Sequence, residues 1–395
     1  MKLALTGAAL YTPEVHFPGG TVVIEGGKIA GAGPERPPRG SSFSILKLNP
    51  DFIVAPGLLD LHTHGFGGCT VSADPLQLAG LSKILASQGV TGFLATTFSA
   101  PLEELAQILA TAAGIQKKKG ALPGASLLGV HLEGPFLNPD YAGAHEAAFL
   151  RRPSSKDLAF LLKNGGPVAL LTLAPELPGA LELIPEAVKL GITVAAGHSG
   201  ATYEETLSAV AAGLSYATHL FNRTTPLHHR APGLPGAALT HPQITVEAIA
   251  DGVHLHPALL KILAGIKREK LVLASDTVPC AGLPPGTYRL GSQTITATEN
   301  EVRTSHGHLA GSARPLSFAV FYVQKVTGLS LAEVLPLATT HPARVLGMDH
   351  KIGRLAPGYE GDLAVFSKEG VPLLTLKQGR VVYRSPRLDL PGLPG

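Results

Sequence analysis

Histidine and carboxylate side chains stand at the ends of several separate apolar segments of this chain. Imidazoles and carboxylates are the side chains that bind divalent cations such as zinc and iron. A bound divalent cation lowers the pKa of a coordinated water and makes it a nucleophile near neutral pH. The pattern therefore predicts a metal-assisted hydrolytic site. The residues of this set are His62, His64, Glu133, His198, His219 and Asp276.

The spacing of the first two histidines favours one shared cation. His62 and His64 are two residues apart in LLDLHTHG, and residues i and i+2 of an extended strand face the same side. A His-x-His pair alone is a weak signal, because histidines also pack at strand ends or cap them. Together with the four other candidates, each at the end of another apolar segment, the pair predicts a metal site.

Other residues near this set have more ordinary interpretations. His131 lies two residues before Glu133, and we expect a hydrogen-bonded strand histidine there rather than a metal ligand. His306 and His308 lie in SHGHLAG, which is typical of a loop, so we expect them to be solvated or next to the substrate. Cys69 follows two glycines, and a small buried thiol is favoured over a metal ligand there.

The middle of the chain predicts a framework that brings distant segments together. Strand-like and helix-like segments alternate there, which is the pattern of a (β/α)8, TIM-like barrel in the α/β class. Active sites of such barrels lie at the carboxyl ends of the strands, where the candidate ligands fall in the first, third, fifth, sixth and eighth segments. A doubly wound open sheet is the alternative, and it would spread these ends along a line. The eight strand-like segments are residues 57–63, 89–98, 125–133, 168–176, 192–199, 214–221, 244–252 and 271–277.

Both ends of the chain predict short strands with glycine turns. Residues 21–33 and 361–384 each read as a hairpin, because strand-forming segments flank Gly-rich turns. We therefore expect a small β-sandwich domain from residues 1–54 and 348–395, and a catalytic barrel from residues 55–347.

Composition narrows the classes of function. Hydrophobic residues make up 45% of the 395 and charged residues 15%, which supports a large buried core. The net charge of +3 gives no strong attraction to nucleic acid. No apolar run reaches the ~18 residues of a membrane span, and the start MKLALTGAAL reads as a first strand rather than a signal sequence. The two cysteines fit a reducing, cytoplasmic location.

Motifs throughout the chain resemble those of the N-acetylglucosamine-6-phosphate deacetylases, a branch of the amidohydrolase superfamily. HLEGPF, THLFN and ADGVH together are specific to this branch, and HHRAPG, LAGSA and GRLAPGYEGDLAVF extend the resemblance almost from end to end. The resemblance implies the barrel and sandwich fold predicted above.

The resemblance also implies a role for each candidate metal ligand. Glu133, His198 and His219 match the main metal site of the family. His62 and His64 match a pair that helps to hold a second ion, with Glu133 bridging the two. The implied cofactor is a divalent metal, either zinc or iron, with one or two ions per chain.

Further matches concern the reaction and the substrate. Asp276 matches an aspartate near the second ion that takes a proton from the attacking water and delivers it to the leaving amine. His254 matches the histidine that contacts the substrate and polarises the acetyl carbonyl. His229 and Arg230 match a phosphate-binding pair that reaches into the neighbouring subunit's site, which implies a homodimer or a dimer of dimers. Contacts to the sugar or acetyl group match Ala144, His145, Asn222, Leu309, Ala310 and Gly311.

The chain departs from the family pattern near the expected substrate. The position after Asn222 is usually small and is Arg223 here, which could add a phosphate or carboxylate contact or narrow the pocket. The segment YAGAH before and including His145 lacks the lysines common there, and Asp276 stands in SDT rather than TDA or TDS. None of these departures removes a reacting group.

The activity implied by the resemblance is hydrolysis of the acetamide of N-acetyl-D-glucosamine 6-phosphate, in amino-sugar catabolism or cell-wall recycling. One alternative is another N-acetylhexosamine 6-phosphate, such as the galactosamine epimer, or a related amidohydrolase substrate such as a cyclic amide. The HHRAPG motif argues against unphosphorylated substrates. A non-catalytic sugar-phosphate sensor is a third possibility, which the full set of reacting groups disfavours.

Overall fold

Eight parallel strands form the centre of the computed structural model, which describes residues 2–12, 15–34, 43–118, 122–163 and 165–388. Neighbouring strands in the sheet follow the order of the chain, and each coincides with one of the eight predicted segments. Their residues are almost all buried, as both faces of the sheet are covered. The strands are β8 (Leu58–Thr63), β11 (Val90–Thr97), β12 (Ser126–Glu133), β13 (Val168–Leu173), β14 (Thr193–Ala196), β15 (Tyr216–Ala217), β16 (Thr245–Ile249) and β17 (Leu271–Ala274).

The barrel closes where the carboxyl ends of its first and last strands meet. The backbone N–H of Asp276 donates to the His62 carbonyl at 2.8 Å, and that of His64 donates to the Thr277 carbonyl at 2.8 Å. Thr63 and Thr277 form a parallel bridge between these bonds. The open-sheet alternative is therefore wrong, and closure places Asp276 directly beside the His-x-His pair.

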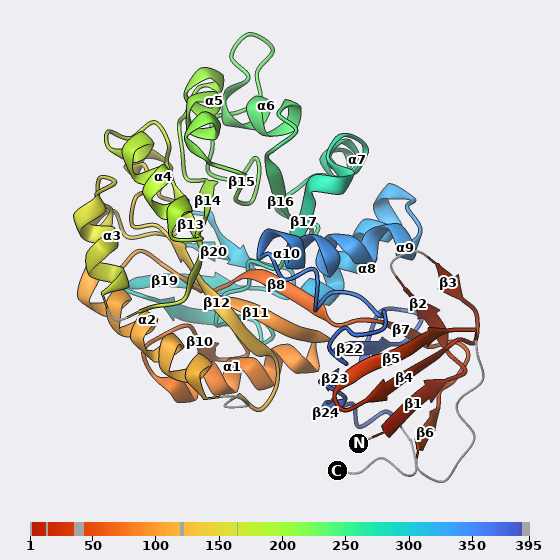
Figure 1. Cartoon of the computed structure of the whole chain (residues 1–395). Helices are drawn as coiled ribbons and strands as arrows, with labels where there is room; N and C mark the ends of the chain where they lie inside the picture. Colours follow the sequence, from red (N-terminus) through yellow and green to blue (C-terminus); the bar gives the residue numbers. More distant parts are fainter. Residues whose placement is uncertain (1, 13–14, 35–42, 119–121, 164, 389–395) are drawn as a thin grey trace.

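Helices surround the strands and bury apolar faces against them (Figure 1). Helix α1 starts after Asp74, whose side chain accepts from the Leu76 N–H, and α5 starts with a capping box between Thr202 and Glu205. The helices are α1 (Pro75–Ser87), α2 (Leu102–Lys117), α3 (Ser155–Leu162), α4 (Ala180–Lys189), α5 (Tyr203–Ala212), α6 (Gly233–Thr240), α7 (Pro257–Ile266), α8 (Leu316–Thr327), α9 (Leu331–Val334) and α10 (Thr340–Val345). Short 3-10 turns are η1 (Pro139–Tyr141), η2 (Ala147–Phe149), η3 (Arg268–Lys270) and η4 (Leu335–Ala338). No helix in the described ranges is long and apolar enough to cross a membrane.

Strands from both chain ends form two further sheets beside the barrel, and red and blue strands meet there in Figure 1. One sheet has the order β5-β4-β1-β6, and the other has the order β24-β23-β22-β7-β2-β3. Apolar residues from both chain ends share one buried cluster, so the predicted sandwich and both predicted hairpins are confirmed. The strands are β1 (Lys2–Thr6), β2 (Ala9–Tyr11), β3 (His16–Phe17), β4 (Thr21–Glu25), β5 (Lys28–Gly33), β6 (Ser44–Lys47), β7 (Ile53–Pro56), β22 (Leu363–Phe366), β23 (Pro372–Lys377) and β24 (Arg380–Arg384).

The exact boundaries of the two parts stay a prediction. Strand β7 belongs to the sandwich sheet yet ends at Pro56, two residues beyond the predicted boundary at 54. Residues 389–395, which the predicted sandwich includes, lie outside the described residues.

A four-stranded antiparallel sheet follows β17, and the sequence analysis did not predict it. The sheet has its own apolar cluster, so it folds as a layer beside the barrel strands. The Ser312 N–H donates to the Asp276 carbonyl at 2.7 Å, which ties this layer to the end of β17. Its strands are β18 (Gly286–Leu290), β19 (Gln293–Ala297), β20 (Glu301–Thr304) and β21 (Leu309–Ser312), and a small ladder joins β9 (Gly65–Phe66) and β10 (Cys69–Thr70).

Candidate active site

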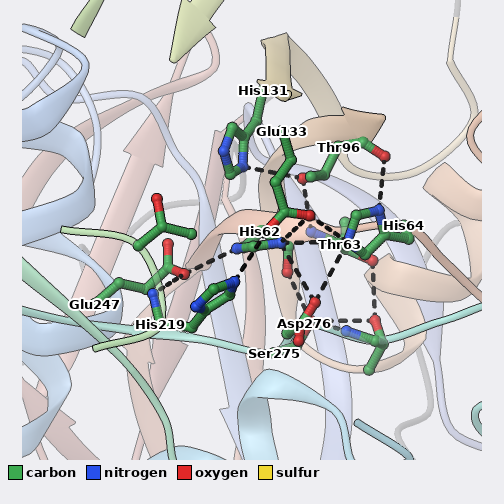
Figure 2. A network of polar contacts seen from close by, with 12 residues as sticks. His62, Thr63, His64, Thr96, His131, Glu133, His219, Glu247, Ser275 and Asp276 are labelled. Carbon is green, nitrogen blue, oxygen red and sulfur yellow. Dashed lines mark hydrogen bonds and ion pairs between the residues drawn. The ribbon is translucent and has the colours of Figure 1, made fainter. Parts of the chain in front are cut away.

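The six predicted metal ligands converge at the carboxyl ends of the barrel strands, in two groups of three. Figure 2 labels all of them except His198. In each group, the possible ligand atoms lie within 4.8 Å of one another, and every residue is buried. One group contains Glu133, His198 and His219, and the other contains His62, His64 and Asp276.

The carboxylate of Glu133 joins the two groups. Its Oε1 lies 3.1 Å from the His198 Nε2 and 3.0 Å from the His219 Nε2. Its Oε2 faces the other way, 3.2 Å from the His64 Nε2 and 3.5 Å from the His62 Nε2. One carboxylate can therefore bridge two cations, one in each group.

Hydrogen bonds fix which nitrogen of His64 and of His198 faces the centre. The Nδ1–H of His64 donates to the Thr96 carbonyl at 3.1 Å, and that of His198 donates to the Tyr141 carbonyl at 2.8 Å. A carbonyl only accepts, so in a neutral imidazole each Nε2 presents a lone pair to the centre. Such outward bonds are typical of metal-binding histidines.

The spacing of these lone pairs fits a divalent cation. The Nε2 atoms of His62 and His64 are 3.3 Å apart, and those of His198 and His219 are 3.1 Å apart. Two ligands bound tetrahedrally to zinc at about 2.0 Å each lie about 3.3 Å from one another. Neutral imidazoles whose lone pairs face each other at that distance repel unless a cation lies between them.

Electrostatics favour a cation in both groups. Burial raises the pKa of Asp276, but the charges of His62 and His64 outweigh it and bring that pKa to about 2. Burial lowers the pKa of His62, yet the carboxylates of Glu247 and Glu133 raise it well above its usual value, and the same negative charge attracts a metal ion. Burial lowers the pKa of His198 to about 4, so its imidazole is neutral and able to bind metal at neutral pH.

Glu247 is a central residue that sequence analysis missed. Its Oε1 accepts from the His62 Nδ1–H at 2.8 Å and from the His219 backbone N–H at 3.0 Å, and its Oε2 accepts from the Tyr216 hydroxyl at 2.9 Å. It therefore orients the ring of His62 in one group and holds the backbone of His219 in the other (Figure 2). A signal was present in the sequence, because a glutamate in the buried strand β16 must find partners for its charge.

Several of these residues have strained backbone. His198, His219 and Asp276 have φ values of 49°, 29° and 50°, in the left-handed region that side chains rarely adopt. Such strain persists where the surrounding structure over-determines the conformation, often at functional sites. Here each residue lies just past its strand, where the turn aims the side chain inward.

A cavity of about 450 Å³ opens above the two groups. Its wall includes the predicted substrate contacts Ala144, His145, Asn222, Arg223, His254, Leu309, Ala310 and Gly311. The antiparallel sheet that follows β17 supplies Leu309, Ala310 and Gly311 through its strand β21. The wall also includes residues that sequence analysis did not single out, among them Phe98, Asp140, Tyr141 and Phe221.

Two histidines on this wall have defined partners. The Nδ1–H of His254 donates to Asp251 Oδ2 at 2.7 Å. Burial lowers the pKa of His254, but this bond and the charge of Asp251 raise it above its usual value. His145 has the opposite tautomer to the histidines described above, because the Ser99 N–H donates to its Nδ1 at 3.0 Å. Its Nε2–H therefore donates to Glu133 Oε2 at 3.1 Å.

The remaining candidates belong to neither group, although the His131 ring centroid lies 4.7 Å from that of His62. His229 and Arg230 are exposed, contact each other at 2.8 Å and do not line the cavity of their own chain. His131 is hydrogen-bonded to the Thr172 hydroxyl at 2.7 Å, as expected of a strand histidine, and it is in neither group. Cys69 is half-buried and is also outside both groups.

A closed (β/α)8 barrel with a histidine and carboxylate centre at its carboxyl face defines a metal-dependent hydrolase. The amidohydrolase family pattern matches residues 53–382, and the chain belongs to that family. A Bacillus subtilis N-acetylglucosamine-6-phosphate deacetylase is 33% identical over 393 residues, 98% of this chain and 99% of that protein.

Two further relatives bear on the substrate. An Escherichia coli N-acetylgalactosamine-6-phosphate deacetylase is 37% identical over 308 residues, 78% of this chain and 81% of that protein. The solved structure of a Mycobacterium smegmatis N-acetyl-D-glucosamine-6-phosphate deacetylase variant, in complex with N-acetyl-D-glucosamine-6-phosphate, is 30% identical with a TM-score of 0.89. That comparison covers 96% of this chain and 99% of the other.

Proposed function

We propose that this protein is a metal-dependent deacetylase that hydrolyses N-acetyl-D-glucosamine 6-phosphate to D-glucosamine 6-phosphate and acetate. The observation that carries the proposal is the pair of ligand groups joined by Glu133 beneath a 450 Å³ cavity. Proteins that are similar to this chain over nearly its full length are named for that activity, which supports this substrate class.

In this proposal each ligand group holds one divalent ion. Glu133, His198 and His219 hold the first ion, and His62 and His64 with Asp276 hold the second. Zinc and iron are the proposed metals, because imidazole and carboxylate ligands suit both. A divalent cation at this position lowers the pKa of a coordinated water and polarises a carbonyl oxygen.

Asp276 and His254 carry the proton transfers and charge stabilisation. The low pKa of Asp276 keeps it ionised, so it can accept a proton from the attacking water and deliver it to the leaving nitrogen. His254 is held by Asp251 and directs its other ring nitrogen to the acetyl carbonyl, where a hydrogen bond stabilises the developing negative charge. The C–N bond then breaks to give acetate and the free amine.

The proposed sugar contacts come from three loops. Ala144 and His145 belong to the loop after β12, and Asn222 belongs to the loop after β15, while residues 309–311 form the start of β21. The Nε2–H of His145 donates to Glu133, which holds the His145 ring at the metal end of the cavity. These residues line the cavity, which supports their role in holding the sugar ring.

The galactosamine epimer is a second candidate substrate, because the Escherichia coli relative named for it is 37% identical. The test measures acetate release from both epimeric N-acetylhexosamine 6-phosphates, with elemental analysis of the same sample. We expect a higher kcat/KM for the glucosamine epimer, and one or two zinc or iron ions per chain. A higher kcat/KM for the galactosamine epimer would reverse the assignment, and no acetate from either would refute deacetylation.

We further propose that the enzyme is a homodimer in the cytoplasm, in which His229 and Arg230 reach the partner's phosphate site. Their exposure and distance from their own cavity support an exchange between subunits, which two-fold symmetry makes reciprocal. Mixing inactive Asp276→Asn chains with Arg230→Ala chains tests this. One site of a mixed dimer would combine an intact Asp276 with an intact Arg230 from the partner chain. Activity at low substrate should therefore exceed that of either parent. If the chains exchange between dimers and activity does not recover, Arg230 does not act in the partner's site.

A further inference from the structure

Arg223 has an unusual position on the wall of the cavity. The loop that supplies His219 continues through Asn222 to Arg223, so a single loop carries a candidate metal ligand and this guanidinium. Among the described residues that line the cavity, Arg223 is the only arginine or lysine. Arg223 is therefore the one guanidinium of this chain that a negatively charged part of a ligand in the cavity can meet.

The surrounding backbone makes room for this side chain. Arg223 has a φ of 52°, and its carbonyl accepts from the Ser199 N–H at 3.0 Å. Its side chain packs over Gly143, where a Cβ would come within 3.0 Å of the Arg223 Nε. The two departures from the family pattern, at Arg223 and in the segment before His145, are thus neighbours in space.

The guanidinium of Arg223 lacks an anionic partner. In the part of the chain that the structure describes, it forms neither an ion pair nor a hydrogen bond, although Asp140 lines the same cavity. The residue is half-buried, and burial lowers its pKa. A charge removed from water without a partner is costly, whereas a guanidinium fork matches the oxygens of a phosphate in geometry and charge.

We propose that Arg223 binds the phosphate group of the substrate from within its own chain and so selects phosphorylated over unphosphorylated amino sugars. The inference rests on the proposed function. It assigns to each chain a phosphate contact that is independent of the exposed pair His229 and Arg230.

The test compares acetate release from N-acetylglucosamine 6-phosphate and from N-acetylglucosamine in the wild type, Arg223→Met and Arg223→Lys. Methionine keeps an unbranched side chain and the Cβ at this left-handed position but removes the charge and the guanidinium. We expect the ratio of kcat/KM for the two substrates to fall roughly 10- to 100-fold in Arg223→Met, mainly through KM for the phosphorylated sugar. Arg223→Lys should restore part of the ratio, since it keeps the charge but loses the fork.

A second measurement separates this inference from the proposed reaction. Calorimetry with D-glucosamine 6-phosphate and D-glucosamine on the metal-loaded enzyme should show the same loss of discrimination in Arg223→Met. Arg380→Met, which removes an exposed arginine of the sandwich, is the control and should keep the wild-type ratios. If the wild type binds the sugar phosphate but releases no acetate, the proposed deacetylation is refuted and the role of Arg223 is not. Unchanged ratios in Arg223→Met, or equal losses for both sugars, would overturn the role of Arg223.

Discussion

Glu247→Gln should weaken metal binding although Glu247 is not itself in either ligand group. The carboxylate accepts from the His62 Nδ1–H, the His219 N–H and the Tyr216 hydroxyl. A glutamine can keep its oxygen toward the first two donors, and the tyrosine hydroxyl can then accept from its amide. The substitution thus preserves the shape of the site and removes the charge that makes His62 a more basic ligand.

The magnitude follows from that charge. Partners that orient metal-binding histidines typically change metal affinity 10- to 100-fold, which corresponds to about 1.4–2.8 kcal/mol at 1.4 kcal/mol per tenfold. We expect the loss mainly in the group of His62, His64 and Asp276. The group of Glu133, His198 and His219 should change less, because Glu247 touches only the backbone of His219.

The assay is calorimetric titration of zinc into chelator-treated protein, in which the second binding event should weaken by the stated factor. Tyr216→Phe is the matched control, because it removes one buried partner of Glu247 but leaves the His62 bond and the charge. Its second binding event should stay within about threefold of the wild type, since the charge-assisted bond is the stronger contribution. Wild-type affinity in a normally folded Glu247→Gln protein would refute the reasoning.

Three other perturbations address the proposed chemistry. Asp276→Asn should lower kcat at least ~10²-fold, the low end for general acid–base catalysis, and near-wild-type turnover would contradict the proton transfer. His62→Ala combined with His64→Ala should reduce bound metal from about two ions toward one per chain, and elemental analysis showing unchanged stoichiometry would contradict the division of ligands. The raised pKa of His254 keeps its imidazole protonated above the usual range, and the proton is lost as pH rises through that pKa. Asp251→Asn removes the carboxylate that raises it, so the alkaline limb of kcat/KM should move to lower pH, and an unmoved limb would exclude His254 as the titrating group.

Local sequence patterns predicted the elements of the barrel because each strand and helix is set by its own periodicity. They did not predict the sheet of β18 to β21, which carries no expected metal ligand and packs mainly on its own apolar cluster. The extent of individual strands also differed. β15 has only two residues, because the chain leaves the sheet early and turns at His219, whose φ is 29°.

The sequence by itself determined which side chains stand at the strand ends and that the strands alternate with helices. Those features are local, so residue types and spacing are sufficient to state them. Tertiary structure decided that Glu247 orients His62 and that Arg223 is the only arginine or lysine among the described residues that line the cavity. These relations join residues from different strands, so they depend on how the barrel closes and on left-handed turns that spacing along the chain does not specify.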